Sequence, residues 1–360
     1  VQRYPTTRPR GRRDEYGDHD VTATPSSIPE AQSEIRAGAG TLAFHRQQIV
    51  FDCLALYYLL DQPYVDRALE GGVTGVNLTF VIEEEWDEAL RRIETGLDKI
   101  ARNPNLVHAT CAGDIVEAKR AGKLAVVIGT QGCTCIGKEF WRLGILARLG
   151  TRFLQLTYSP ANLYGDGCGE TRDAGLTFLG KDLIAAVNEQ PMMLDLSHCG
   201  HRTSREAIAL ARAPVFTHAN AYAVHSNDRN KKDESIRAIV EKGGMIGVCA
   251  LPRAVRNERP SLEDMLDHLQ HIGRLVGVEN VGIGLDFIAV YSGAGGKILP
   301  DSYRWRTLRP DVWGTVEDFY HQKYPDGLDT IRKLPNLTQG LFDRGYAPDA
   351  VAGVLGANWL

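Results

Sequence analysis

The sequence predicts an α/β protein of the (β/α)8 TIM-type barrel class, and three observations lead to this prediction. From residue 47 onward, short apolar runs rich in β-branched residues alternate with longer segments of helical periodicity, as in βα repeats around a parallel sheet. Eight such runs occur, which is the number that a closed barrel needs. The alternative, an open doubly wound sheet, usually has a glycine-rich loop after its first strand, and residues 51–60 contain no glycine.

Each predicted strand is a short apolar run bounded by polar or turn-forming residues. In chain order the strands are Ile49–Phe51, Val73–Leu78, Leu124–Ile128, Arg152–Leu156, Met192–Leu196, Pro214–Thr217, Met245–Val248 and Val281–Leu285. Amphipathic segments long enough for crossover helices lie between them, at Asp114–Gly122, Lys181–Glu189, Ser204–Arg212, Asp233–Lys242 and Leu262–Val276. The pairs Gly71-Gly72 and Gly243-Gly244 are predicted to end helices just before strands.

The first 46 residues differ in composition from the rest of the chain. They mix arginines with acidic residues and prolines and contain few large apolar side chains, so they could not form a core of their own. We expect residues 1–46 to form an arm and residues 47–360 to form one barrel domain. Whether the arm lies on the barrel, on a neighbouring subunit or in solvent is open.

Composition and charge exclude several classes of function. With 41 Lys and Arg against 45 Asp and Glu, the chain has a net charge of −4 and no positive excess for a nucleic-acid partner. No apolar run approaches the roughly 18 residues that a membrane span needs. The 7 cysteines show no CxxC spacing, which favours a reducing compartment. We expect a cytoplasmic homodimer that acts on a small molecule and does not bind membranes.

Polar side chains follow the predicted strands at the end where barrel enzymes build their active sites. Gln131 comes after the third strand, Tyr158 after the fourth, His198 after the fifth, His218 after the sixth and Asp286 after the eighth. Because the carboxyl ends of barrel strands surround one centre, we expect these five side chains to face each other.

The two histidines stand on consecutive strand ends, and neutral imidazole is a common zinc ligand. Two imidazoles are too few for a closed site, and Asp286 is the carboxylate that could complete it. Arg229, in the loop beyond His218, is predicted to bind a substrate carboxylate through two parallel hydrogen bonds. Pairing of Arg229 with a nearby aspartate, Asp228 or Asp233, is an equal alternative.

These segments together resemble the membrane (renal-type) dipeptidases, peptidase family M19 of the amidohydrolase-like barrels. The matching stretches are Lys123–Gly132, Leu149–Gly180, Met192–His198, Pro214–His218, Arg229-Asn230, Gly243–Val248, Val281–Phe287 and Leu355–Asn358. The resemblance implies a barrel with two zinc ions that share a bridging glutamate, and a metal-bound hydroxide that attacks the peptide carbonyl of a dipeptide.

The resemblance also implies roles for single residues. His198 and His218 match the two histidines of one metal, and Asp286 matches an aspartate that assists proton transfer. Arg229 matches an arginine that holds substrate, and Tyr158 falls where many members have a substrate-contacting histidine. Gln131 and Asn230 complete the expected substrate-binding set.

The sequence departs from the family pattern where the other metal would bind. Leu54 and Leu56 occupy the positions of an HxD pair of ligands, and Gln131 replaces the bridging glutamate. Leucine cannot bind a metal and a neutral amide is a poor bridge, so we expect one zinc ion at most, held by His198 and His218, or none. Thiolates near the strand ends are an alternative source of ligands: Cys53, Cys133, Cys135 and Cys199.

Three functions remain open on these grounds. The first is a dipeptidase-like hydrolase of a dipeptide or small amide that uses at most one metal. The second is a metal-independent isomerase, lyase or cyclase that acts on a carboxylate-bearing small molecule in a biosynthetic pathway. The third is a non-catalytic binding protein. Tyr164, Arg253 and Tyr291 are further candidates for substrate recognition, and the insertion Gly293–Trp313, which carries Tyr303, is predicted to be a lid or a dimer contact.

Overall fold

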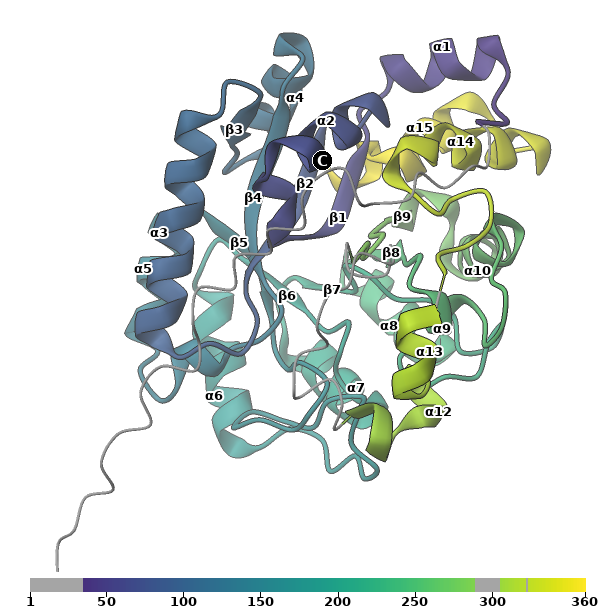
Figure 1. Cartoon of the computed structure of the whole chain (residues 1–360). Helices are drawn as coiled ribbons and strands as arrows, with labels where there is room; N and C mark the ends of the chain where they lie inside the picture. Colours follow the sequence, from purple (N-terminus) through teal and green to yellow (C-terminus); the bar gives the residue numbers. More distant parts are fainter. Residues whose placement is uncertain (1–34, 289–304, 322) are drawn as a thin grey trace, which may run out of the picture.

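The computed structural model describes residues 35–288, 305–321 and 323–360, and it shows a parallel β-barrel surrounded by helices (Figure 1). The strand order is β7-β6-β5-β4-β2-β1-β9-β8, and neighbouring strands are parallel. A parallel bridge between Phe216 and Ile246 joins the two ends of this order and closes the barrel. The predicted (β/α)8 fold class is therefore confirmed.

The barrel contains all eight predicted strands. They are β1 (Phe51–Leu56), β2 (Gly75–Val81), β4 (Leu124–Thr130), β5 (Thr151–Gln155), β6 (Met193–Asp195), β7 (Pro214–Val215), β8 (Ile246–Val248) and β9 (Val281–Ile283). The first strand was misplaced, because it begins at Phe51, where the prediction ended. Asp52 lies inside this strand with its carboxylate bound to backbone N–H groups, so a charged residue in the pattern does not mark a strand end. The short strand β3 (Leu106–His108) pairs with β4 outside the barrel and was not predicted.

Helices cover the outside of the barrel (Figure 1). The longer ones are α2 (Gln62–Glu70), α3 (Trp86–Arg102), α4 (Ala112–Ala121), α5 (Trp141–Arg148), α6 (Phe178–Asn188), α7 (His201–Leu210), α8 (Asp233–Glu241), α10 (Leu262–Val276), α14 (Leu334–Asp343) and α15 (Pro348–Leu355). Short helical turns are η2 (Tyr57–Leu60), η3 (Thr134–Ile136), α9 (Pro252–Val255), η4 (Val278–Asn280), α12 (Pro310–Trp313), α13 (Val316–His321), η6 (Ile331–Lys333) and η7 (Ala357–Trp359). The prediction that glycine pairs end α2 and α8 is confirmed, since Gly72 and Gly243 take left-handed backbone angles, with φ of 81° and 77°.

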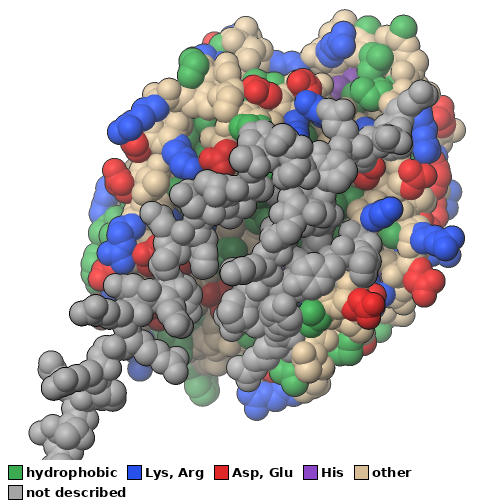
Figure 2. Space-filling model, in the orientation of Figure 1, with side chains coloured by type: hydrophobic (Ala, Val, Ile, Leu, Met, Phe, Trp, Pro, Cys, Tyr) green, Lys and Arg blue, Asp and Glu red, His purple; other side chains and the backbone are tan. Residues whose placement is uncertain are grey.

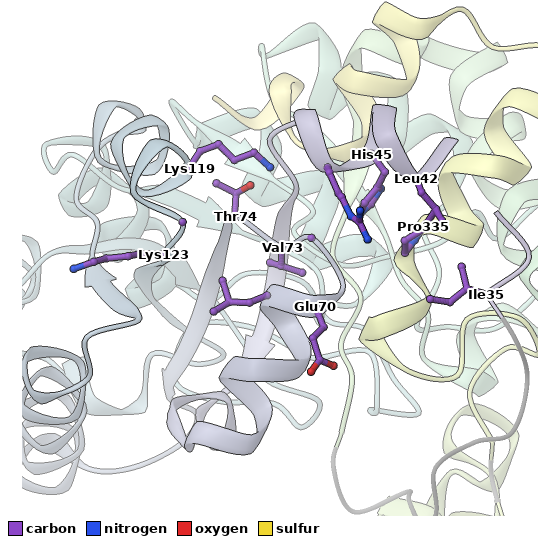
Figure 3. Close-up of a pocket in the computed structure, with 13 residues that line it drawn as sticks. Ile35, Leu42, His45, Glu70, Val73, Thr74, Lys119, Lys123 and Pro335 are labelled. Atoms are coloured by element: carbon purple, nitrogen blue, oxygen red, sulfur yellow. The ribbon is translucent and has the colours of Figure 1, made fainter. Parts of the chain in front are cut away.

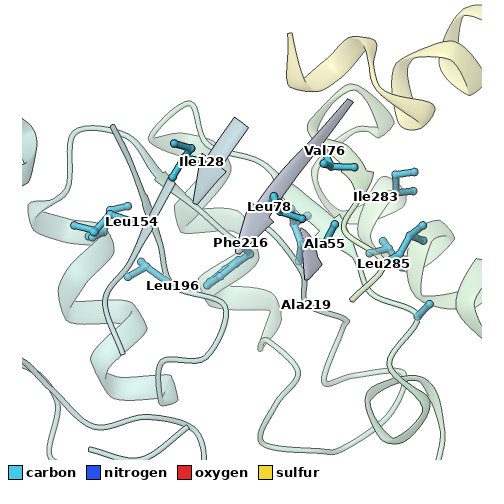
Figure 4. Packing of buried hydrophobic residues seen from close by; sticks show 14 of the residues in the cluster. Ala55, Val76, Leu78, Ile128, Leu154, Leu196, Phe216, Ala219, Ile283 and Leu285 are labelled. Carbon is cyan, nitrogen blue, oxygen red and sulfur yellow. The ribbon is translucent and has the colours of Figure 1, made fainter. Parts of the chain in front are cut away.

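The main hydrophobic core lies between the barrel strands and these helices (Figure 4). The strand residues Val76, Ile128 and Leu154 are buried there, together with Leu196 and Phe216, which follow β6 and β7. Burial of a large apolar side chain contributes about 1.5–3 kcal/mol, so this layer holds the strands in register. A rigid barrel fixes the positions at which the site residues leave the strands.

The helix α1 (Ala39–Gln47) lies at the end of the barrel where α14 and α15 lie (Figure 1). The Phe44 ring packs edge-on against Phe342 with centroids 5.1 Å apart, and Thr41 Oγ1 donates to Gln339 Oε1 at 2.6 Å. The last part of the predicted arm is therefore a helix docked on the barrel. Residues 1–34, Tyr291 and Tyr303 lie outside the described residues.

Side chains of both charge signs alternate over the face shown in Figure 2, in keeping with the absence of a positive excess in the sequence. No helix in the described part of the chain is long and apolar enough to cross a membrane.

Candidate active site

The two predicted histidines meet at the carboxyl end of the barrel. Asp195 of β6 pairs with Val215 of β7, and His198 and His218 follow these paired residues at the same offset. Both imidazoles are buried, and their Nε2 atoms lie 3.0 Å apart within hydrogen-bond distance. The expectation that two consecutive strand ends bring these side chains together agrees with this geometry.

The neighbours of the two rings determine which nitrogen carries each proton. Thr217 donates its hydroxyl proton to Asp195 at 2.6 Å, so it can only accept from Nδ1–H of His218, which lies 2.6 Å away. His218 then offers a lone pair at Nε2, and His198 donates to it from its own Nε2–H. His198 Nδ1 in turn accepts from Ser159 Oγ at 3.2 Å. A hydrogen-bond chain therefore runs from Ser159 through both histidines to Asp195.

Burial sets the charge state of the pair. Desolvation, reinforced by the nearby charge of Arg229, holds the pKa of His198 and of His218 well below its usual range. Both imidazoles are accordingly neutral at pH 7, and the hydrogen bond between the two Nε2 atoms requires at least the acceptor, His218, to be so.

Asp195 connects the loops that carry the histidines. Its Oδ1 accepts from the backbone N–H and hydroxyl of Ser197 at 2.9 and 2.5 Å and from Thr217 N–H at 3.1 Å. The carboxylate is buried, and desolvation raises the pKa of Asp195. Asp195 was not among the predicted site residues, although an aspartate in an apolar run, two residues before a serine, was an available signal.

Arg229 lies behind the histidine pair and is only 1% exposed. Its Nη1 donates to the Ser197 carbonyl and its Nη2 to the His218 carbonyl, both at 2.7 Å. The alternative of pairing with a nearby aspartate is wrong, since Asp228 pairs with Arg309 and Asp233 with His271. The guanidinium thus holds the backbone of both histidine loops.

Asn230 and Gln131, both assigned to substrate binding from the sequence, are buried and bonded to the protein. Asn230 Nδ2 donates to the carbonyls of His225 and Ala254, and its Oδ1 has no partner among the described residues. Gln131 Nε2 donates to Thr79 Oγ1 at 2.9 Å. In this arrangement both amides anchor the strand-end loops.

Two buried carboxyl groups belong to Asp52, the second residue of β1, and to Asp286, which follows β9. Asp52 Oδ1 accepts from the backbone N–H of Leu285 at 2.7 Å and of Leu54 at 3.1 Å. Asp286 has φ of 55°, a left-handed angle that is uncommon for a residue other than glycine. Desolvation raises the pKa of each carboxyl to about 7, and the charge of Asp286 adds to the shift of Asp52. Both groups can therefore exchange protons near neutral pH.

The structure does not assemble a metal site from the predicted ligands. The described residues contain no group of three or more His, Cys, Asp or Glu side chains that could hold a metal ion, so Asp286 does not complete a site with the histidine pair. Leu54, at one of the positions of the missing ligands, is 1% exposed.

The cysteine alternative also lacks support. Cys53, Cys133 and Cys199 are fully buried, and desolvation raises the pKa of each thiol, that of Cys199 to about 12. Lys231, which the sequence analysis did not single out, is buried beside Cys199 and donates from Nζ to its carbonyl at 2.7 Å. Desolvation lowers the pKa of Lys231 to about 8.

Aromatic side chains enclose His198. Tyr158 stacks on the imidazole with centroids 4.6 Å apart, and Trp313 lies nearly parallel to it at 6.2 Å. Trp305 contacts Tyr158 at 5.1 Å. Arg309 fastens this segment over the strand ends, since its Nη2 donates to Asp228 at 2.6 Å. The described part of the predicted insertion thus covers the histidine pair, as a lid would.

We expect the burial of Asp52 to make folding stability depend on pH. Its pKa of about 7 lies above the value of about 3.9 in an unfolded chain, so the folded protein binds more protons between these limits. This carboxyl therefore lowers stability as pH rises from 4 to 7, by up to about 1.4 kcal/mol per pH unit. Asp52→Asn, which keeps an acceptor oxygen, should flatten the curve, as measured by urea unfolding at pH 5, 6 and 7. An equally steep curve for this variant would contradict the assignment.

Comparisons with known proteins come from sequence and from structure. The family model described as "Membrane dipeptidase (Peptidase family M19)" matches residues 54–302. The chain is 30% identical over 245 residues to dipeptidase aclJ of Aspergillus oryzae, covering 66% of this chain and 51% of that protein. It is 28% identical over 289 residues to dipeptidase verJ of Clonostachys rogersoniana, covering 78% of this chain and 66% of that one. The chain thus spans between about half and two thirds of these curated relatives.

Two solved structures have the same fold. An amidohydrolase from Pseudomonas aeruginosa superposes with a TM-score of 0.78 at 28% identity, covering 89% of this chain and 96% of that one. A metallo peptidase from Rhodobacter sphaeroides, solved with a phosphinate mimic of the dipeptide L-Ala-D-Ala, gives a TM-score of 0.71 at 22% identity over 87% and 98% of the two chains.

Proposed function

Since this chain belongs to the membrane dipeptidase family, peptidase family M19, we propose that it is a dipeptidase-like hydrolase that cleaves a dipeptide or another small amide. The observation that carries the proposal is the pair of buried imidazoles, His198 and His218, with Nε2 atoms 3.0 Å apart at the carboxyl end of the barrel. The names of the relatives support a small peptide-like substrate.

The two-zinc centre that the family implies does not fit the donor atoms of this chain. Leu54 and Leu56 have no donor atom, and the Gln131 amide donates to Thr79. The two Nε2 atoms lie 3.0 Å apart, close to the distance of about 3.3 Å between two nitrogen ligands of one tetrahedral zinc. The histidine pair could therefore hold one ion at most. The described residues supply no third ligand of the usual kinds. We therefore derive no step of the reaction through a metal.

The proposed proton transfers use groups of the chain itself. Asp286, whose pKa burial raises to about 7, takes a proton from the attacking water when it is ionised. The water oxygen bonds to the amide carbon, the carbon–nitrogen bond breaks, and the leaving amine takes from Asp286 the proton that this carboxyl removed from the water, while the neutral imidazole of His198 orients the amide by hydrogen bonding. His218 and Asp195 hold this imidazole in the donor tautomer.

A second candidate is a metal-independent isomerase, lyase or cyclase that acts on a small carboxylate-bearing molecule. The observation that favours it is the hydrogen-bond chain from Ser159 through both histidines to Thr217 and Asp195. Such a chain can move a proton to and from a bound molecule. No contact in the described residues favours a protein that only binds.

Metal-depleted and zinc-supplemented protein, assayed against a panel of dipeptides, tests the first candidate. We expect hydrolysis of at least one dipeptide and, by elemental analysis, no more than one zinc ion per chain. Two ions per chain would contradict the donor count. Absence of hydrolysis with and without zinc would overturn the hydrolase, and the product masses from a panel of small carboxylates would then test the second candidate.

A further inference from the structure

A cavity of about 390 Å³ lies at the amino-terminal end of the barrel strands (Figure 3). Thr74 and Lys123, which line it, directly precede β2 and β4, whereas the histidine pair follows the opposite ends of the strands. The last turns of α1 and α4 form part of its wall. Its volume falls within the roughly 300–1,000 Å³ range of small-molecule sites. The proposed hydrolase has no use for this cavity.

Three cationic side chains from two separate helices and one loop line the cavity: Arg46, Lys119 and Lys123. Figure 3 shows the Lys119 ammonium directed into it, near Thr74. Within the described part of the chain, the Lys119 ammonium has no hydrogen-bond or ion-pair partner, and desolvation lowers its pKa. A half-buried cation without a counter-charge is costly, and a bound anion would offset that cost.

The remaining polar groups of the wall do not neutralise these cations. Glu70, the acidic residue among the lining side chains, pairs with Arg332, and its carboxylate points away from the cavity in Figure 3. Both ring nitrogens of His45 are bonded, to Thr338 Oγ1 and to the Gly71 carbonyl. The Thr74 hydroxyl accepts from Val50 N–H, which leaves its own proton for a ligand. The cavity thus combines positive charge with a hydroxyl donor.

We propose that this cavity binds a small phosphate-bearing anion through Arg46, Lys119 and Thr74. Guanidinium, ammonium and hydroxyl groups that line one cavity from different elements match the several acceptor oxygens of a phosphate group. Inorganic phosphate and a phosphomonoester metabolite share this chemistry. The cavity is a binding site separate from the histidine pair.

The positions of Arg46 and Lys119 in their helices offer a simpler explanation for these two cations, and the test must distinguish it from anion binding. Arg46 and Lys119 lie in the last turns of α1 and α4, where a cation interacts favourably with the helix dipole even without a ligand. Lys242 ends α8 in a comparable way and donates to the Ala209 carbonyl, but it does not line the cavity. It therefore serves as the matched control.

Isothermal titration of the full chain with inorganic phosphate, and separately with ribose 5-phosphate, tests the proposal at constant ionic strength set by sodium chloride. We expect saturable binding that Lys119→Gln and Arg46→Gln each weaken at least tenfold and that Lys242→Gln changes by less than twofold. Circular dichroism verifies the fold of each variant. Tighter binding of ribose 5-phosphate supports a metabolite as the ligand, and equal affinity supports phosphate itself. Absence of saturable binding of both, or equal loss in all three variants, would overturn the proposal.

Discussion

Replacement of His198 or His218 by alanine is expected to reduce substrate turnover by about 10²- to 10⁴-fold, the range that general acid–base groups contribute. Each change breaks the hydrogen bond between the two Nε2 atoms and interrupts the chain from Ser159 to Asp195. The loss is expected for both candidate functions, since the pair orients the amide in the hydrolase and moves a proton in the second candidate. Steady-state kinetics on the substrate found in the dipeptide or carboxylate panel measure it.

Two further variants separate chemistry from packing. His198→Gln retains much of the side-chain volume between Tyr158 and Trp313 and should still lose turnover. His271→Ala removes a part-buried histidine that is bonded to Asp233 on the outer helices and should leave turnover unchanged. Full turnover in His198→Gln with an intact fold would remove this residue from the mechanism.

The largest effect on stability is expected for Asp195→Ala. The substitution removes the acceptor of four hydrogen bonds from Ser197 and Thr217 and leaves their two backbone N–H groups buried without a partner, while the two hydroxyls, 3.3 Å apart, can bond to each other. Each unsatisfied buried donor costs about 1–3 kcal/mol, and we expect the free energy of unfolding to fall by about 3–5 kcal/mol. Urea unfolding monitored by circular dichroism measures the change.

Asp98→Ala is the control for this experiment. Asp98 forms an ion pair with Arg102 on the surface of α3, with 44% of its side chain exposed, and its loss should cost less than about 1 kcal/mol. Equal losses for the two aspartate variants would show that the Asp195 hydrogen bonds do not hold the loops together.

The sequence was sufficient to predict the barrel and the meeting of the two histidines for one physical reason. Apolar runs locate the strands, and parallel strands bring all their carboxyl ends to the same side. The same logic placed Asp286 and Gln131 correctly at strand ends. The short strand β3 was not predicted, because a strand of three residues is too short to show a periodic pattern in the sequence.

Hydrogen-bond partners that side chains acquire only when the barrel closes could not be predicted from the sequence. Arg229 binds two backbone carbonyls, and a side-chain pattern does not reveal backbone acceptors. The tautomers of the histidines depend on where Thr217 donates its proton, which requires atomic positions. The homodimer, the cytoplasmic location, the domain boundary after residue 46 and the roles of the site residues stay predictions.

The bond from the Leu285 N–H to the Asp52 carboxylate joins the first and last strands of the barrel. A ribosome that has made Asp52 must add 233 more residues before its partner exists. Before then the Asp52 carboxylate lacks this hydrogen-bond donor, so its burial would be costly, and β1 has no β9 with which to pair. Formation of the site therefore waits until β9 has been made, and nascent chains that stop before it carry the histidines without the closed barrel that positions them.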